Sequence, residues 1–396
     1  MFTIQSALPV CQDEFLATPD NDRLVLVLNA LNLEPLLLRM GADHRVGRRG
    51  HGMRVLLRAL IAAWVYELHS IAHLRRELLR NASLRLLCGI PSPLAVPAED
   101  AFDRLIARLA EHVDDVEEMF TRMVMRLREE IPELGEHVAI DSTAIKAWSE
   151  GNRTVPADPD ADWGKKSVSA KGRMGWWFGY KVHLAVDTTA EIPLAYTVTP
   201  ASEHDIKQSK PLLDKVEAQQ PVGHLKAVME DAAYDSGDNH LDIWQRGALP
   251  IIDLNSRGWP TPDGFNDEHC PVCACKTEMR YLGRDRAYVK YTTGKGCTCP
   301  KAGGITRWRI DANIRLHPPL PQHTPTWQKL YNERTSVERV NGRTKEHLRL
   351  DGLRHRGLPK VRVHVALSLT VLVAGALGMI REGHREWART VVRLAA

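Results

Sequence analysis

The chain has 396 residues, 44% of them hydrophobic and 26% charged, so it is long enough for two or more domains with a substantial core. A net charge of +4 is too small by itself to indicate a nucleic-acid-binding protein. The first residues, MFTIQSALPVCQDEF, lack the basic and apolar regions of a secretory signal. We therefore expect a cytoplasmic protein without a disulfide framework.

The first third of the chain has a helical pattern. Apolar residues recur at spacings of three and four from about 22 to 132, apart from a basic loop at 41–52, and this predicts an all-α region. Arginines gather in and after the loop, namely Arg45, Arg48, Arg49, Arg54, Arg58, Arg75, Arg76, Arg80 and Arg85. They form either a solvated face of a helical bundle or a surface that contacts DNA phosphates.

The periodicity changes at about residue 136. Alternating or short apolar runs predict strands, and longer amphipathic runs predict helices. The expected elements are strands at 137–141, 179–187 and 191–199, a helix at 205–219, a strand at 225–230, a helix at 236–247 and a strand at 248–254. This order predicts an α/β fold with helices packed on a mixed sheet, and it resembles the topology of the ribonuclease H-like fold.

The remainder divides into an irregular stretch and two helices. Residues 255–325 are rich in Gly, Pro and Cys, which predicts an insertion, and a helix is expected from 327 onward. The apolar run at 365–380 has 16 residues, short of the ~20 that span a bilayer, so we expect a buried core helix and no membrane contact.

Cysteines concentrate in the predicted insertion. Cys270 and Cys273 form a C-x2-C pair, and Cys297 and Cys299 form a C-x-C pair. Four thiolates suit a structural zinc ion, and Cys275 and His269 are spare potential ligands. Free buried thiols are the alternative.

Two acids, Asp141 and Asp231, stand at the ends of predicted strands. Neighbouring strand ends in an α/β sheet face a shared crevice, where carboxylates can hold divalent cations. Glu338, on the predicted helix after 327, is a candidate third carboxylate. Taken singly, each acid is more often a turn, cap or ion-pair residue.

The local sequence around these acids decides between the two interpretations. The segment YNERTSVERVNGRTK has the pattern Tyr-x2-Arg-x3-Glu-x6-Lys, which spaces Tyr331, Arg334, Glu338 and Lys345 along one face of a helix. This pattern resembles the signature of bacterial insertion-sequence transposases of the IS-four group. AIDSTAIKA at 139–147 and EDAAYDS at 230–236 resemble the family's two aspartate motifs, although the family usually has Gly where Ala233 stands.

The resemblance covers nearly the whole chain and implies a specific chemistry. Asp141, Asp231 and Glu338 would form a DDE triad that holds two Mg²⁺ or Mn²⁺ ions, cuts element ends and joins them to target DNA. Tyr331, Arg334 and Lys345 would bind DNA phosphates. Residues 1–132 would be a helical DNA-binding domain and 133–396 a catalytic domain carrying the insertion at 255–325. We expect a homodimer on double-stranded DNA. The alternative to an active transposase is an inactive, DNA-binding descendant of one.

Four other acids lie close to the motifs in sequence. Asp187, Asp205, Glu230 and Asp235 stand at a predicted turn, a helix start, a strand and a cap region. We expect structural roles for all four, and a side chain of Glu230 that points to the opposite face from Asp231.

Overall fold

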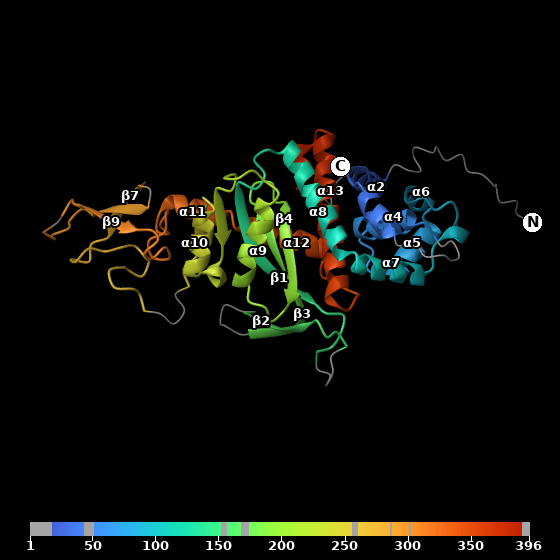
Figure 1. Cartoon of the computed structure of the whole chain (residues 1–396), viewed down its shortest axis with the longest axis horizontal. Coiled ribbons are helices and arrows are strands. Elements are labelled where there is room, and N and C mark those ends of the chain that lie inside the picture. The colour runs from blue at the N-terminus through green and yellow to red at the C-terminus, as the bar shows by residue number, and fades with distance from the viewer. Residues whose placement is uncertain are drawn as a thin grey trace, which may run out of the picture. The chain divides into compact units, whose positions relative to one another are not determined.

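A computed structural model describes residues 18–42, 51–151, 157–167, 174–255, 260–285, 287–300 and 302–389 (Figure 1). The chain forms two compact units, and each unit uses separate stretches of sequence. The first unit comprises Met1–Ile131, Ile145–Tyr180 and Gly342–Ala396, and the second comprises Pro132–Ala144 and Lys181–Asn341.

The described residues from 18 to 131 form helices, as the apolar spacing predicts. Side chains cap several of them: Ser70 Oγ accepts a hydrogen bond from the His73 amide, and Asn81 Oδ1 accepts one from the Leu84 amide. The helices are α2 (Pro19–Ala30), α3 (Glu34–Ala42), α4 (Met53–Val65), α5 (Ile71–Arg80), α6 (Ala82–Cys88), η1 (Pro93–Ala95), α7 (Glu99–Glu111) and α8 (Val113–Glu130).

Helix α13 (Leu358–Arg381) is the core of the first unit, where it packs against α8, α2, α7 and α4. It is apolar and long enough to cross a membrane, but 94% of its most apolar window is buried inside the protein. The bent pair of α2 with Glu34–Gly41 passes the same test of length and composition. The burial of α13 agrees with the core helix predicted at 365–380.

Six strands form the main sheet, in the order β2-β3-β1-β5-β6, with β4 paired to β3. Strands β1, β5 and β6 are parallel and β2 and β3 are antiparallel, so the sheet is mixed as predicted. The strands are β1 (His137–Lys146), β2 (Asp162–Ser167), β3 (Met174–Asp187), β4 (Pro193–Pro200), β5 (Ala227–Glu230) and β6 (Leu249–Ile252).

Strand β2 and the first part of β3 were absent from the predicted elements. The polar segment DWGKKS of β2 has no apolar alternation, and it becomes a strand by pairing with Met174–Gly179 of β3. A Cβ on Gly179 would stand 2.1 Å from the Ile145 carbonyl oxygen, so only glycine allows the chain to pass there.

Helices cover the strands of the second unit. Helix α9 (Ile206–Glu217) packs on β4, α10 (Gly237–Gln245) packs on β6, and the short η2 (Ala232–Tyr234) follows β5. Figure 1 shows α9 and α10 beside the strands of the sheet. The order of strands and helices from β3 to β6 matches the prediction.

Between β6 and α11 the chain forms a second sheet, β7-β8-β9 (Met279–Asp285, Tyr288–Thr293 and Ile305–Arg309). Its small core contains Met279, Val289, Tyr291, Ile310 and Ile314. Leu241 and Trp244 of α10 pack against this core, which attaches the inserted sheet to the second unit.

The helix predicted from 327 is in fact two helices, α11 (Pro325–Asn332) and α12 (Thr335–His347). Glu333 lies at the break, where its carboxylate accepts a hydrogen bond from Thr188 Oγ1 and lies 3.0 Å from His137 Nδ1. These contacts with β1 and with the turn after β3 hold the chain where one helix ends and the next begins.

Candidate active site

The first two predicted acids stand level on neighbouring parallel strands. The register of β1 and β5 pairs His137 with Ala227 and Ala139 with Met229, so two residues further on Asp141 lies beside Asp231. Strand β1 continues to Lys146, so Asp141 lies inside the strand and not at its predicted end. Strand β5 ends at Glu230, so Asp231 directly follows its strand, as predicted.

The side chain of Asp231 points to the same face as that of Asp141. Asp231 keeps an extended backbone (φ −82°, ψ 176°), so the alternation of the strand continues through it. Its Oδ1 accepts a hydrogen bond of 2.8 Å from the Ala233 amide, which fixes the carboxylate at the end of the strand.

Both aspartates are poorly solvated anions with anionic neighbours. Burial raises the pKa of Asp141 to about 7, and the charges of Asp231 and Glu338 add to this rise while the Ser142 amide and Arg334 oppose it. Burial also raises the pKa of Asp231, and Arg334 again opposes the rise. The charges of Asp231, Glu338 and Arg334 therefore all lie near the Asp141 carboxyl group.

Helices α11 and α12 present the remaining residues of this site. Arg334 Nη2 donates a hydrogen bond of 2.8 Å to Glu338 Oε1, and its guanidinium lies 5.6 Å from the centre of the Tyr331 ring. Tyr331 stacks on the buried Trp327 at 4.6 Å. Burial raises the pKa of Tyr331, and the nearby charge of Asp231 adds to the rise.

Arg334 carries a buried donor without a partner. Its Nε has no hydrogen-bond acceptor among the described residues, although burying an unpaired donor is unfavourable. Half of the Glu338 side chain, 52%, is exposed. A phosphate oxygen at this place would satisfy the donor.

Lys345 lies two turns beyond Glu338 on α12, and its Nζ lies 3.4 Å from Asp351 Oδ1. A role of Lys345 in phosphate binding stays a prediction.

The predicted acids do not include Asp253, which the structure places in the same row. The register pairs Glu230 with Ile252, so Asp253 follows β6 as Asp231 follows β5. Its charge raises the pKa of Asp231, and its Oδ1 accepts a hydrogen bond of 2.6 Å from Gln322. The signal in the sequence was the same as for Asp231: an acid directly after a short apolar strand.

Asp205 also belongs to the surroundings of Asp231, whose pKa it raises. It stands at the N-cap position of α9, the helix start expected, and its side chain accepts a hydrogen bond of 2.8 Å from Lys181 Nζ instead of capping the helix. The site thus holds more carboxylates than cationic groups, an imbalance that favours binding of a divalent cation.

The other neighbouring acids have structural roles, as expected. Asp187 accepts hydrogen bonds from the Gly135, Thr189 and Ala190 amides. Asp235 pairs with Arg315 and lies 3.1 Å from His240 Nε2. Burial alone would raise the pKa of Asp235, but these two partners lower it to about 2. The Arg315 contact ties the inserted segment to the chain that follows Asp231.

Glu230 points to the opposite face from Asp231, as the alternation predicts. It is fully buried and accepts hydrogen bonds from Ser209 Oγ of α9 (2.5 Å) and Asn239 Nδ2 of α10 (2.6 Å). Burial raises its pKa to about 8. Burial therefore favours the protonated form of this hydrogen-bonded core residue.

We expect Glu230→Gln to change how stability depends on pH. The folded pKa of Glu230 lies above its unfolded value of about 4.3, so its contribution is complete below about pH 4 and is lost as pH rises through 8. Gln keeps the shape of the Glu230 side chain, but its amide group does not titrate. In urea unfolding, the stability of the variant relative to wild type should increase between pH 5 and 8. A difference that stays constant would refute the buried proton.

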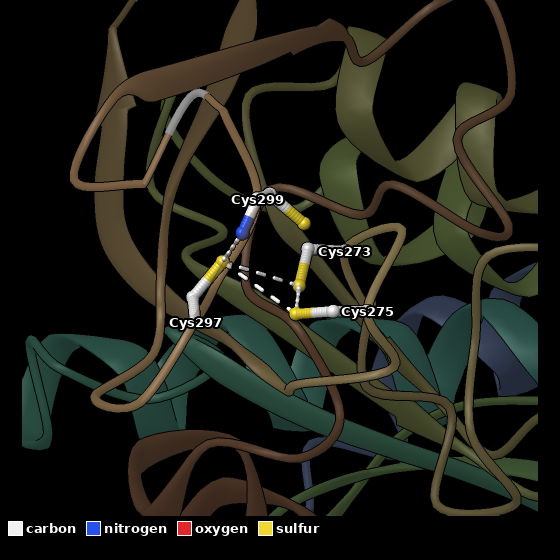
Figure 2. Close-up of side chains that lie close together, drawn as sticks. All are labelled: Cys273, Cys275, Cys297 and Cys299. Carbon is white, nitrogen blue, oxygen red and sulfur yellow. Dashed lines mark hydrogen bonds between the residues drawn. The ribbon is translucent and has the colours of Figure 1, made fainter.

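The cysteines gather in one group, with a membership that differs from the predicted one (Figure 2). The group consists of Cys273, Cys275, Cys297 and Cys299, whose sulfurs all lie within 4.8 Å of one another. Cys270 is not among them: it is buried, and its thiol lies 3.5 Å from the Met279 carbonyl oxygen, to which it donates. Cys275, predicted only as a spare ligand, takes its place.

The arginines expected at a DNA surface fall into three sets. Arg45, Arg48 and Arg49 lie outside the described residues. Arg54 pairs with Glu34, Arg80 pairs with Glu77, and Arg85 donates to the Leu78 and Leu79 carbonyls, so these three have partners within the helical region. Arg58, Arg75 and Arg76 remain candidates for phosphate contact.

Comparison with known proteins identifies the family of the chain. A family model described as "Transposase DDE domain" matches residues 132–374, more than half of the chain, and includes Asp141, Asp231 and Glu338. A second model, described as "Transposase domain (DUF772)", matches residues 13–108.

Relatives and a solved structure were also found. Two proteins from strains of Halobacterium salinarum, each named "Probable transposase for insertion sequence element ISH11", are 25% identical over 336 residues, 84% of this chain and 82% of theirs. A piggyBac transposase synaptic complex with hairpin DNA shares 11% identity over 94% of this chain and 79% of that one, with a TM-score of 0.45, too low to support an argument. On the first family model, the chain belongs to the family of proteins with a transposase DDE domain.

Proposed function

We propose that this transposase cleaves DNA at the ends of its element and joins them to target DNA by in-line phosphoryl transfer. The observation that carries the proposal is that Asp141 of β1 lies level with Asp231, the residue directly after the parallel strand β5, beside the Arg334–Glu338 pair. In this proposal the sheet and its helices are a ribonuclease H-like fold, residues 133–396 form the catalytic domain, and residues 1–132 bind DNA.

The donor set fits Mg²⁺ or Mn²⁺. Asp141, Asp231 and Glu338 would hold the ions, because hard divalent cations prefer carboxylate oxygens and the site has too few cationic groups to balance these anions. When bound, such ions supply charge neutralisation at the phosphate and activation of the attacking oxygen.

The other residues position the substrate. Arg334 places a guanidinium with an unpaired buried donor beside the carboxylates, where it would bind a non-bridging phosphate oxygen. Tyr331, held in place by Trp327, would contact the same phosphate. Positioning of this kind accounts for much of the rate in phosphoryl transfer. Cutting two element ends implies a homodimer on DNA.

The proposal is tested with labelled duplexes that span the DNA on either side of the gene encoding this chain. We expect wild type to nick these duplexes in Mg²⁺ or Mn²⁺ and not in EDTA, and Glu338→Gln to bind them while cutting about 10²–10³-fold more slowly. Glu346→Gln is the matched control, since its side chain is exposed on the same helix. Binding without cutting by wild type would favour an inactive, DNA-binding descendant.

A further inference from the structure

Four thiols outside the candidate active site converge on one point in the inserted segment. Cys273 and Cys275 precede strand β7, and Cys297 and Cys299 follow strand β8, so two separate loops supply them (Figure 2). The Cys273 and Cys275 sulfurs are 3.1 Å apart, and the Cys297 sulfur lies 3.6 Å from Cys273 and 3.7 Å from Cys275.

These separations fit a single metal ion better than a disulfide. An ion about 2.3 Å from each of four tetrahedral thiolates separates neighbouring sulfurs by about 3.8 Å. A disulfide needs about 2.05 Å, which is far shorter than the smallest separation here. A cluster of several irons would hold the sulfurs further apart than the observed limit of 4.8 Å.

Both loops are folded into tight turns that point their sulfurs inward. Lys276 adopts a left-handed conformation (φ 64°), unusual for a residue with a side chain, and its amide donates to the Cys273 carbonyl over 2.9 Å. Gly296 (φ 86°) forms the corresponding turn directly before Cys297. The Cys299 amide donates to the Cys297 sulfur over 3.4 Å, as amides do around metal-bound thiolates.

The same geometry explains why the C-x2-C spacing misleads. The Cys270 sulfur donates its proton toward the carbonyl oxygens of Met279 (3.5 Å) and Pro271 (3.6 Å), so it behaves as a neutral thiol of the core. The four sulfurs that converge come from one C-x-C pair on each loop, Cys273 with Cys275 and Cys297 with Cys299.

The inserted sheet is small, and a bound ion would stabilise it. Among the described residues its buried core has five members, with five partly buried side chains packed around them, and a core of this size rarely holds a small sheet together without a metal or cross-link. We propose that Cys273, Cys275, Cys297 and Cys299 bind one Zn²⁺ as four thiolates, releasing their protons to solvent, and that the ion fixes the two loops of the inserted sheet. Zinc is redox-inactive, and it is the usual ion in closed structural sites made of four thiolates.

Metal analysis of the full chain tests this directly. After purification without chelator and dialysis against Mg²⁺ buffer, wild type should retain about one zinc per chain. The zinc content of Cys275→Ser should be at least tenfold lower. Because the Cys275 side chain is exposed, its replacement by Ser should not unfold the protein. Cys270→Ser is the matched control: its hydroxyl can donate to the same carbonyls, and it should keep the full complement of zinc.

Cobalt substitution supplies a second readout. Co²⁺ added to the metal-free wild type and to Cys270→Ser should give intense thiolate-to-cobalt absorption, and Cys275→Ser should not. Zinc-free wild type after growth in zinc-supplemented medium would overturn the proposal. So would iron in place of zinc, or loss of zinc from Cys270→Ser with retention in Cys275→Ser. None of these outcomes depends on DNA cleavage.

Discussion

Asp141→Asn and Asp231→Asn are each expected to lose DNA-end cleavage by about 10³-fold or more while retaining DNA binding. The two carboxylates face the same side of neighbouring strands, so each supplies oxygen ligands that the other cannot replace. An amide keeps the shape of the side chain but loses its charge. Cleavage and gel-shift assays on the same labelled duplex separate the two effects.

The fold of these variants should survive, and Asp141→Asn should be more stable than wild type when no divalent metal is present. The folded pKa of Asp141, about 7, exceeds its unfolded value of about 3.9. Its stabilising contribution is therefore present below about pH 4 and lost as pH rises through 7. At pH 8 we expect the apparent Tm of Asp141→Asn to be roughly 2–5 °C higher than that of wild type.

Asp238→Asn is the matched control for the predicted loss of DNA cleavage, because Asp238 is exposed on α10. It should cut DNA at close to the wild-type rate. If Asp231→Asn also retained near wild-type cleavage, that residue would be removed from the triad.

Much of the fold follows from local patterns in the sequence. The periodicity of apolar residues identified the helices before residue 132, the strands β3 to β6 with their helices, and the burial of 365–380. The alternation in β5 also predicted that Glu230 and Asp231 face opposite sides. These features depend on contacts that repeat along the chain, which is why one sequence is enough to find them.

Features that depend on distant partners were not predictable in this way. The polar strand β2 exists because it pairs with β3, and the break between α11 and α12 lies where Glu333 contacts Thr188 and His137. Cys275 replaces Cys270 in the thiol group because the turn at Lys276 selects which sulfurs converge. Sequence spacing alone does not carry that information.

The candidate site lies between these two cases. Asp141, Asp231 and Glu338 were each ambiguous as single residues, and their motifs, through a family resemblance, selected them. The register of β1, β5 and β6 shows what the motifs leave out, namely that Asp253 stands in the same row of acids.

A thiolate in place of Asp141 is expected to change which metal supports cleavage. Mg²⁺ binds thiolates poorly, whereas Mn²⁺ accepts them more readily. If the Asp141 carboxylate is a direct metal ligand, Asp141→Cys should lose activity in Mg²⁺ and recover part of it in Mn²⁺. Asp238→Cys, made at an exposed position, should cut in both metals.

The most direct test of the proposed active site is therefore cleavage of labelled element-end DNA by wild type and Asp141→Cys, each in Mg²⁺ and in Mn²⁺. We predict activity of wild type in both metals and of Asp141→Cys in Mn²⁺ alone, with a difference of about 10²-fold or more between the metals. Equal cleavage by Asp141→Cys in Mg²⁺ and Mn²⁺ at the wild-type rate would show that Asp141 holds no metal, and would contradict the proposed active site.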